Sequence, residues 1–224
     1  MSYFSDEFLG FLKELAANNN RDWFHANKKR YEKNVKEPFA AFVGELIARV
    51  KETDKRIEIQ PKDAIFRIYR DTRFSKDKTP YKTNVSAVIS PGGRKDATNL
   101  GLYIEMNPEH IRVYSGAYML DKAQLEDIRY HIANNLEKFD KLLNEKSFKD
   151  NFGTIRGEQN KRLPKELREA GDLQNLIYNK QFYWFTELDP ELATHPELPQ
   201  LVMDKYHACG NMRAFIAEGL GVPA

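Results

Sequence analysis

The sequence has a single cysteine, Cys209, and no long hydrophobic run among its 224 residues. One cysteine cannot form an intramolecular disulfide, so a reducing compartment is expected. No segment approaches the roughly 18 consecutive apolar residues of a membrane-spanning helix. Charged residues also interrupt the N-terminal segment, where a secretory signal would need an unbroken apolar stretch. We therefore expect a cytoplasmic protein that has no membrane partner.

Sequence motifs for metals and common cofactors are missing as well. The five histidines are scattered without a His-x-x-x-His pair, and one cysteine cannot supply a Cys-x-x-Cys pair. The chain has no Gly-x-x-x-x-Gly-Lys-Ser/Thr loop, no Gly-x-Gly-x-x-Gly fingerprint and no Gly-x-Ser-x-Gly turn. The sequence thus predicts no metal site and identifies no cofactor.

Neither positive nor negative residues are in large excess in the sequence. The 35 lysines and arginines nearly balance the 33 aspartates and glutamates, which leaves a net charge of +2. A protein that coats nucleic acid generally carries a much larger positive charge. A nucleic-acid partner is therefore an alternative that the overall charge does not favour.

Apolar periodicity predicts helices in the first fifty residues and strands after them. Phe8, Leu12 and Leu15 recur at helical spacing, and Pro38 suits the first turn of a later helix. From Ile57, β-branched and aromatic residues occur in short runs between turn formers. The expected strands are residues 65–70, 84–90, 100–106 and 111–115. The last two are close enough in sequence to form an antiparallel hairpin.

Helical patterns return in the last hundred residues. Asp121 is expected to cap a helix, and residues 199–219 are expected to form one long C-terminal helix. Cys209 would be a buried small side chain on that helix rather than a nucleophile. The aromatic run 183–185 is expected in the core or in a subunit contact.

This order of elements predicts an α+β fold. It comprises N-terminal helices, a central antiparallel sheet of about four or more strands, and C-terminal helices. We expect a single domain over residues 1–224, because no repeat or flexible linker divides the chain. A subdivision near residue 118 is the less favoured alternative.

Residues 67–82 concentrate positive charge that the rest of the chain lacks. The cations of this segment are Arg67, Arg70, Arg73, Lys76, Lys78 and Lys82. Two carboxylates reduce these six charges to +4, so the remainder of the +2 chain sums to −2. A connection of about a dozen residues between strands is uncommon in a compact domain unless it has a function. We therefore expect the function to lie in this segment.

The predicted site is a pocket for an anionic group. Guanidinium forks pair with the oxygens of phosphate or carboxylate, so Arg70, Arg73 and Lys78 are the expected anion contacts. Tyr81 is expected to form a wall of the pocket or to donate a hydrogen bond. Arg67 is a further candidate ligand residue, although strand alternation places it opposite Arg70 and gives it a more structural role.

Other residues are expected to support this pocket. Asp71 and Asp77 would repel an anion unless they pair with arginines. We therefore expect them to orient those arginines and not to contact the ligand. Phe74 is an apolar anchor of the loop. Arg21 and Trp23 are candidates for a further cation and an aromatic wall, but a core position for Trp23, with Asp22 as a helix cap, is the simpler interpretation.

The sequence leaves the function open between two classes. The first is a pocket for a phosphate- or carboxylate-bearing small molecule; whether it is an enzyme is undecided, and phosphate-ester or nucleotide chemistry would be the first candidate reaction. The second is a non-catalytic module that contacts an acidic protein surface or a nucleic-acid backbone. A purely structural network of arginines and aspartates is a further alternative. The oligomeric state is not predicted.

The same residues carry a family resemblance. The pattern Arg67-x-x-Arg70-Asp71-x-Arg73-Phe74, followed by Asp77-Lys78 and Tyr81, resembles an uncharacterised family of conserved hypothetical proteins of the DUF2461 type. The N-terminal Phe11-Leu12 helix and the run from Asn19 to Phe24 are similar too, so the resemblance extends over nearly the whole chain. It implies no reaction, cofactor or substrate.

Overall fold

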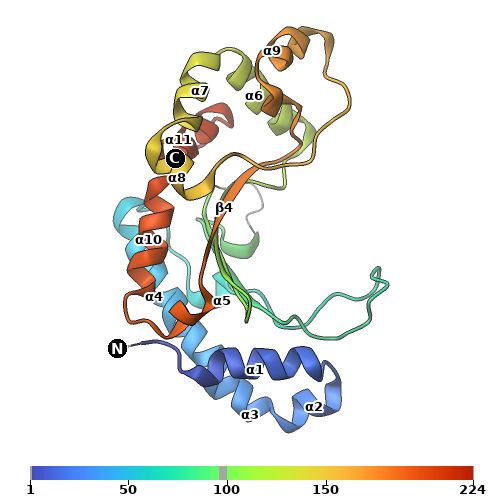
Figure 1. The fold of residues 1–224 in the computed structure, drawn as a ribbon, viewed down its shortest axis with the longest axis vertical. Coiled ribbons are helices and arrows are strands. Elements are labelled where there is room, and N and C mark those ends of the chain that lie inside the picture. The colour runs from blue at the N-terminus through green and yellow to red at the C-terminus, as the bar shows by residue number, and fades with distance from the viewer. Residues whose placement is uncertain (1, 96–99, 224) are drawn as a thin grey trace. The chain divides into compact units, whose positions relative to one another are not determined.

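The computed structural model describes residues 2–95 and 100–223, and it has the predicted α+β architecture (Figure 1). Contacts between Cα atoms divide the chain into two compact units. Unit 1 comprises Met1–Arg94, Tyr103–Val113 and Glu187–Met203. Unit 2 comprises Lys95–Leu102, Tyr114–Thr186 and Asp204–Ala224. The single-domain interpretation stays a prediction.

Five α-helices lie in the N-terminal part of unit 1 among the described residues. They are α1 (Asp6–Ala17), α2 (Arg21–Ala26), α3 (Lys28–Tyr31), α4 (Glu37–Thr53) and α5 (Pro61–Ala64). The predicted apolar stripe of α1 is buried, since Phe8, Leu12 and Leu15 are each fully inaccessible to solvent. The cap of α2 is Asn20, not the predicted Asp22, because the Asn20 side chain accepts the Trp23 N–H at 2.9 Å.

A π-helical turn, Glu32–Lys36, lies between α3 and α4. Within it the Glu37 N–H donates to the Glu32 carbonyl, a bond that spans five residues instead of four. Pro38 follows directly and has no N–H with which to continue an α-helical ladder. The proline therefore starts α4, as predicted, and the chain before it adopts the wider turn.

Four strands form one antiparallel sheet in the order β1-β2-β3-β4. They are β1 (Val85–Ile89), β2 (Leu102–Met106), β3 (Ile111–Ala117) and β4 (Phe182–Leu188). The predicted hairpin between the 100–106 and 111–115 segments is confirmed as β2 and β3. Its turn is held by the Asn107 side-chain oxygen, which accepts the N–H groups of Glu109 and His110 at 2.8 and 2.9 Å.

One of the expected strands was wrong, and one strand was missed. Residues 65–70 make only isolated bridges, Ile65 with Ala87 and Tyr69 with Tyr81. Ile65 and Tyr69 are four positions apart on one side, whereas their partners Ala87 and Tyr81 are six positions apart on the other. The register is therefore not constant, and no regular ladder forms. The sequence interpretation also missed β4, whose aromatic residues were expected only to pack in a core or an interface.

Unit 2 is largely helical. Its helices include α6 (Lys122–Ala133), α7 (Leu136–Leu143), α8 (Lys146–Phe152), α9 (Arg168–Leu173) and α11 (Gly210–Gly219). The predicted cap of α6 is confirmed: the Asp121 side chain accepts the Gln124 N–H at 2.9 Å. Phe148 and Trp184 meet edge to face in the core of this unit, with ring centroids 5.4 Å apart.

The predicted C-terminal helix is divided. α10 (Leu198–Ala208) and α11 are separated at Cys209, so residues 199–219 do not form one continuous helix. Cys209 is buried, as expected, and burial raises the pKa of its thiol. None of the helices in residues 2–95 and 100–223 is long and apolar enough to span a bilayer.

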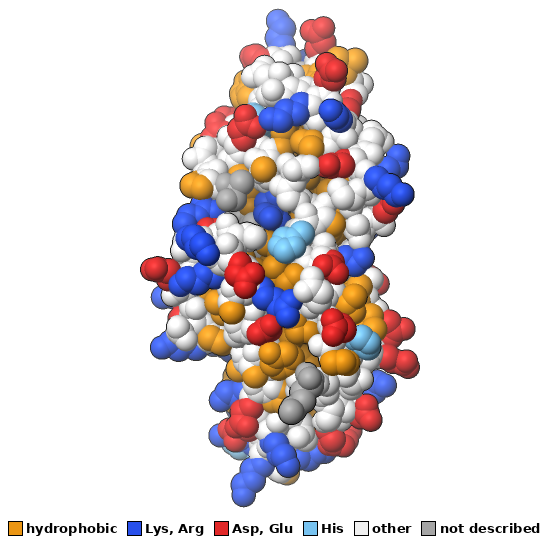
Figure 2. Space-filling view, turned by 90° about the vertical axis from the view of Figure 1, so that its left-hand side faces the viewer, with side chains coloured by type: hydrophobic (Ala, Val, Ile, Leu, Met, Phe, Trp, Pro, Cys, Tyr) orange, Lys and Arg blue, Asp and Glu red, His pale blue; other side chains and the backbone are white. Residues whose placement is uncertain are grey.

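The surface carries mixed charge, as the composition predicts. Figure 2 shows one face of the molecule on which lysines and arginines are interspersed with aspartates and glutamates. Neighbouring charges of opposite sign reduce each other's field at a distance. A local excess of positive charge therefore requires several cations to lie close together with no acidic residue among them, and the described residues of unit 1 contain such a group.

One glycine of the sheet is required by its backbone. Gly116 in β3 has φ of +111°, and a Cβ there would lie 2.3 Å from the Phe182 carbonyl oxygen. We expect Gly116→Ala to lower the free energy of unfolding by about 2 kcal/mol or more. Gly10→Ala in α1 is the matched control, because its Cβ would meet no atom within 4 Å, and it should change stability by less than about 1 kcal/mol. Equal urea midpoints for the two variants would contradict this account.

Candidate functional site

Residues 70–82, which we call the arm, extend from unit 1 as a hairpin (Figure 1). At its base, Arg70 N–H donates to the Pro80 carbonyl at 2.9 Å and Lys82 N–H donates to the Ile68 carbonyl at 2.8 Å. These bonds pair the two sides of the hairpin only where it leaves the body of the unit. Beyond them, side chains must hold the arm.

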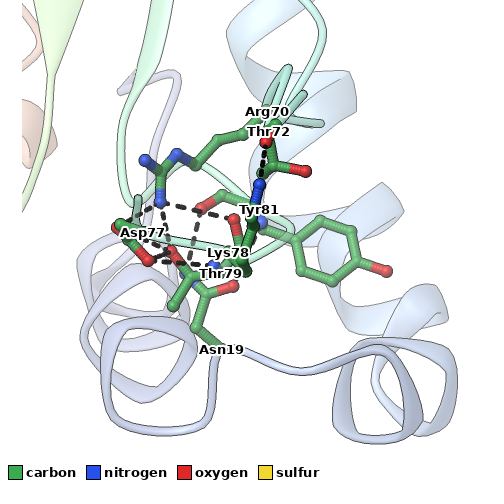
Figure 3. A network of polar contacts seen from close by, with 7 residues as sticks. All are labelled: Asn19, Arg70, Thr72, Asp77, Lys78, Thr79 and Tyr81. Atoms are coloured by element: carbon green, nitrogen blue, oxygen red, sulfur yellow. Dashed lines mark hydrogen bonds and ion pairs between the residues drawn. The ribbon is translucent and has the colours of Figure 1, made fainter. Parts of the chain in front are cut away.

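The arm is attached to the N-terminal helices through Tyr81. The Asn19 amide donates to the Tyr81 carbonyl at 2.9 Å and accepts the Tyr81 N–H at 3.1 Å, so one side chain satisfies both backbone groups (Figure 3). The Tyr81 ring stacks on Phe24 with centroids 4.0 Å apart and is only 3% exposed. Tyr81 is therefore an anchor of the arm.

Inside the arm, side chains compensate one another's charge. The Arg70 guanidinium contacts the Asp77 carboxylate and the Thr79 hydroxyl, and Asp77 also accepts the Thr79 N–H at 2.9 Å (Figure 3). The Lys78 ammonium donates to the Thr72 carbonyl at 2.8 Å across the hairpin. The arm is thus held by polar contacts rather than by an apolar core.

The tip of the arm points into solvent. Arg73 pairs with Asp71 at 2.7 Å, and 77% of the Arg73 side chain is exposed. Phe74 is 95% exposed, with the Arg73 guanidinium 5.8 Å from its ring centroid. Phe74 therefore does not anchor the loop on the body of the protein.

The predicted clamp is not assembled in this structure. Arg70 pairs with Asp77 and Arg73 pairs with Asp71, so the two arginines face different aspartates of the arm. Neither arginine lines the pocket described below. Arg21 is exposed, and Trp23 is half-buried and packs on Phe11 with centroids 5.4 Å apart, whereas Asp22 does not cap the helix as the simpler interpretation expected.

A pocket of about 490 Å³ opens beside the base of the arm, entirely within unit 1. Four cations line it, and they come from four different segments of the chain: Lys36, Lys62, Arg67 and Arg94. The rest of the lining is apolar or aromatic apart from Asn84: Tyr31, Phe39, Ala40, Ile65, Phe66, Ile68 and Val85. No described residue in the lining is acidic.

The π-helical turn brings two of these residues together. In an α-helix a side chain shares its face with the residue four positions later, whereas a π-turn brings the fifth residue to that face. Tyr31 and Lys36 are five residues apart and both line the pocket, while Val35 is fully buried. The turn that precedes Pro38 therefore places a cation, rather than a valine, beside Tyr31.

Arg94 reaches the pocket because Gly93 allows a close approach. Gly93 has φ of +57°, and a Cβ there would lie 2.6 Å from the carbonyl oxygen of Asp63 in α5. The adjacent Arg94 guanidinium donates to the carbonyls of Lys62 and, at 3.0 Å, Ile65. These bonds satisfy backbone carbonyls at α5 and hold the guanidinium at the pocket lining.

The remaining cations of the pocket make no ion pair. Among the described residues no ion pair or side-chain hydrogen bond is found for Lys36, Lys62 or Arg67, although the charge of Arg67 contributes to lowering the pKa of Asp71. Burial and the nearby positive charge of Arg67 lower the pKa of Lys82, which lies 5.2 Å from the ring of Phe66. The lining therefore carries a net positive charge.

Two neutral polar side chains, Tyr31 and Asn84, also line the pocket. Burial raises the pKa of Tyr31 to about 12, so its hydroxyl remains a neutral donor at physiological pH. The Asn84 amide donates to Glu105 at 3.1 Å, and Glu105 lies 3.3 Å from His110. This contact orients the Asn84 amide with its nitrogen toward the carboxylate.

Sequence reasoning found only part of this pocket. Of the predicted ligand residues, Arg67 lines the pocket. The other three cations of the lining, Lys36, Lys62 and Arg94, were not predicted as site residues. Nothing in their spacing connects them, because they lie on separate elements that meet only after folding. Pro38 was the one visible signal, since a proline within a long helical pattern marks an irregular turn.

The part of the chain that the structure describes contains no group of three or more His, Cys, Asp and Glu side chains placed to hold a metal ion. A family model described as "Conserved hypothetical protein (DUF2461)" matches residues 7–215. No curated protein and no solved structure matches the chain.

The ion pairs of the arm can be tested by titration. Hydrogen bonds from the Thr79 N–H and from Arg70 lower the pKa of Asp77 to about 2, and hydrogen bonds from Arg73 lower that of Asp71 to about 2. Each folded pKa lies below the usual 3.8, so these pairs contribute above about pH 4 and are lost as the pH falls toward about 2. Carboxyl carbon shifts measured by NMR should show midpoints near 2 for both residues.

Two variants serve as each other's control. Arg70→Ala should raise the midpoint of Asp77 and leave that of Asp71 unchanged, and Arg73→Ala should do the reverse. Midpoints near 4 for both aspartates in the wild type would show that the arm is not held by these pairs.

Proposed function

The chain belongs to the DUF2461 family of conserved hypothetical proteins, and we propose that it binds an organic anion in the pocket of unit 1. The observation that carries this proposal is the composition of the pocket lining: four cations and no described acidic residue. The chain as a whole carries a net charge of only +2, so four cations around one cavity are a local excess of positive charge. A phosphate or carboxylate group would supply the missing acceptors.

The residues offer complementary contacts to such a group. Arg67 can present two parallel N–H donors, and Lys36 and Lys62 are point charges that need no fixed geometry. Arg94 already uses part of its guanidinium on backbone carbonyls, which restricts its motion. A pre-positioned donor loses less conformational freedom on binding than a mobile one.

The proposal is one of binding. The described lining contains no histidine, cysteine, aspartate or glutamate to act as a nucleophile or general base. The cations could stabilise negative charge on a phosphate ester or nucleotide, and a reaction would need its nucleophile from a lysine or Tyr31 of the lining, from a substrate or from water. We therefore propose that recognition of the anion is the primary role of the pocket.

The arm supports a second candidate function. Its polar network holds an almost fully exposed aromatic ring, Phe74, next to Arg73. Rigid aromatic and arginine side chains are common centres of protein interfaces. We propose contact with an acidic protein surface as this alternative, and a nucleic-acid backbone as the variant of it that charge favours less.

The pocket proposal can be tested with two arginine variants. Arg67→Ala should weaken binding of phosphate- and carboxylate-bearing ligands about tenfold, or about 1.4 kcal/mol, because one charge-assisted contact is lost. Arg73→Ala is the matched control, since it removes the same side chain from the arm and should leave affinity unchanged. Isothermal titration calorimetry with inorganic phosphate, nucleoside monophosphates, carboxylates and a single-stranded oligonucleotide would measure both.

The opposite pattern has a clear meaning. If Arg73→Ala abolished binding while Arg67→Ala retained it, the arm would be the anion site and the pocket proposal would be overturned. A wild-type protein that bound none of the small anions would overturn it as well.

A further inference from the structure

We infer that the ligand of the pocket is amphipathic, with an apolar body on the pocket floor and its anionic group among the rim cations. This inference rests on the proposed function and specifies the class of anion. The expected ligands are alkyl or aryl phosphates or carboxylates. Inorganic phosphate and hydroxyl-rich sugar phosphates are expected to bind more weakly.

Polar and apolar side chains are segregated within the pocket. Lys36, Lys62, Arg67 and Arg94 are all exposed residues, so their charged groups form a rim at the solvent side. The apolar lining is buried or half-buried: Phe39, Ile68 and Val85 are 1%, 6% and 7% exposed. The charged end of a ligand would therefore stay near water while its body entered an apolar environment.

The floor offers little to a polar body. Its neutral polar side chains are those of Tyr31 and Asn84. The Asn84 nitrogen is already bonded to Glu105, and the Asn84 Oδ1 is the one buried side-chain acceptor of the lining that has no hydrogen-bond partner among the described residues. A sugar ring with several hydroxyls would lose its water contacts there and regain few hydrogen bonds. A hydrocarbon or aromatic body would instead gain from contact with Phe39, Phe66 and Ile68.

The size of the pocket leads to the same ligand class. A volume of about 490 Å³ lies within the range of cavities that hold small organic molecules. Inorganic phosphate would contact the rim and leave most of this space to water against apolar walls. An apolar body would displace that water, and its contribution would add to that of the charged group.

A matched pair of ligands separates body from head group. Hexyl phosphate and a hexose phosphate share the same head group and six carbons, but only the hexose carries hydroxyls. We expect hexyl phosphate to bind the wild-type protein at least tenfold more tightly. A series of linear carboxylates from four to eight carbons should gain about threefold to fourfold in affinity for each added methylene, until the floor is filled.

Two variants locate the effect in the pocket. Ala40→Phe fills the floor from α4 and should remove the chain-length gain while retaining the weak binding of inorganic phosphate. Arg67→Ala should weaken every member of the series by a similar factor and preserve the gain per methylene. An alkyl anion adsorbed elsewhere on the protein would respond to neither variant.

The outcomes separate this inference from the proposed function. If hexose phosphate bound as tightly as hexyl phosphate, and both required Arg67, the anion site would stand and the amphipathic ligand would be excluded. If no phosphate or carboxylate bound, the proposed function would fail and the inference with it. A chain-length gain that survived Ala40→Phe unchanged would overturn the assignment of the body to this floor.

Discussion

The missing N–H of Pro38 is the constraint on which the pocket depends. A regular helix from Lys28 to Thr53 would need a hydrogen bond at that position, and proline cannot donate it. The turn before it widens instead, and the Glu37 N–H reaches back to Glu32. Because of the wider turn, Lys36 and not Val35 lies with Tyr31 in the pocket lining. The missing N–H of Pro38 thus determines where the positive charge of Lys36 is placed.

Charge compensation then distinguishes the two cationic regions of unit 1. In the arm, Arg70 and Arg73 are neutralised by aspartates only a few residues away, and Lys78 bonds a backbone carbonyl. These pairs are solvent-exposed, so they order the hairpin more than they stabilise the protein. The described cations that line the pocket form no ion pair with a carboxylate, so their free donors are available to a ligand. Arg67 connects the two regions, because it precedes the arm in sequence and lines the cavity.

The sequence predicted the fold class, α1, the start of α4, the β2–β3 hairpin and the cap of α6 because each depends on local periodicity or turn chemistry. It failed at β4, because the four consecutive aromatic residues 182–185 show no apolar–polar alternation in the sequence, although their burial alternates in the structure. It also failed at residues 65–70, where an irregular register replaces the ladder that composition suggested.

The pocket shows the same limit at the level of side chains. A cluster of cations in one segment is visible in a sequence, but whether each is already paired is not. Arg70 and Arg73 have aspartates nearby in sequence that satisfy them, whereas Lys36, Lys62 and Arg94 converge through three separate elements and a close approach at Gly93. Their relation is a property of tertiary structure alone.

The central claim is that a ligand anion meets Arg67 and its neighbours in the pocket, not the arginines of the arm. Titrating hexyl phosphate into ¹⁵N-labelled protein and following the arginine Nε–Hε signals by NMR tests this directly. The account predicts saturable shifts for Arg67 and Arg94 with Arg70 and Arg73 unchanged. Shifts confined to Arg70 and Arg73 would contradict it.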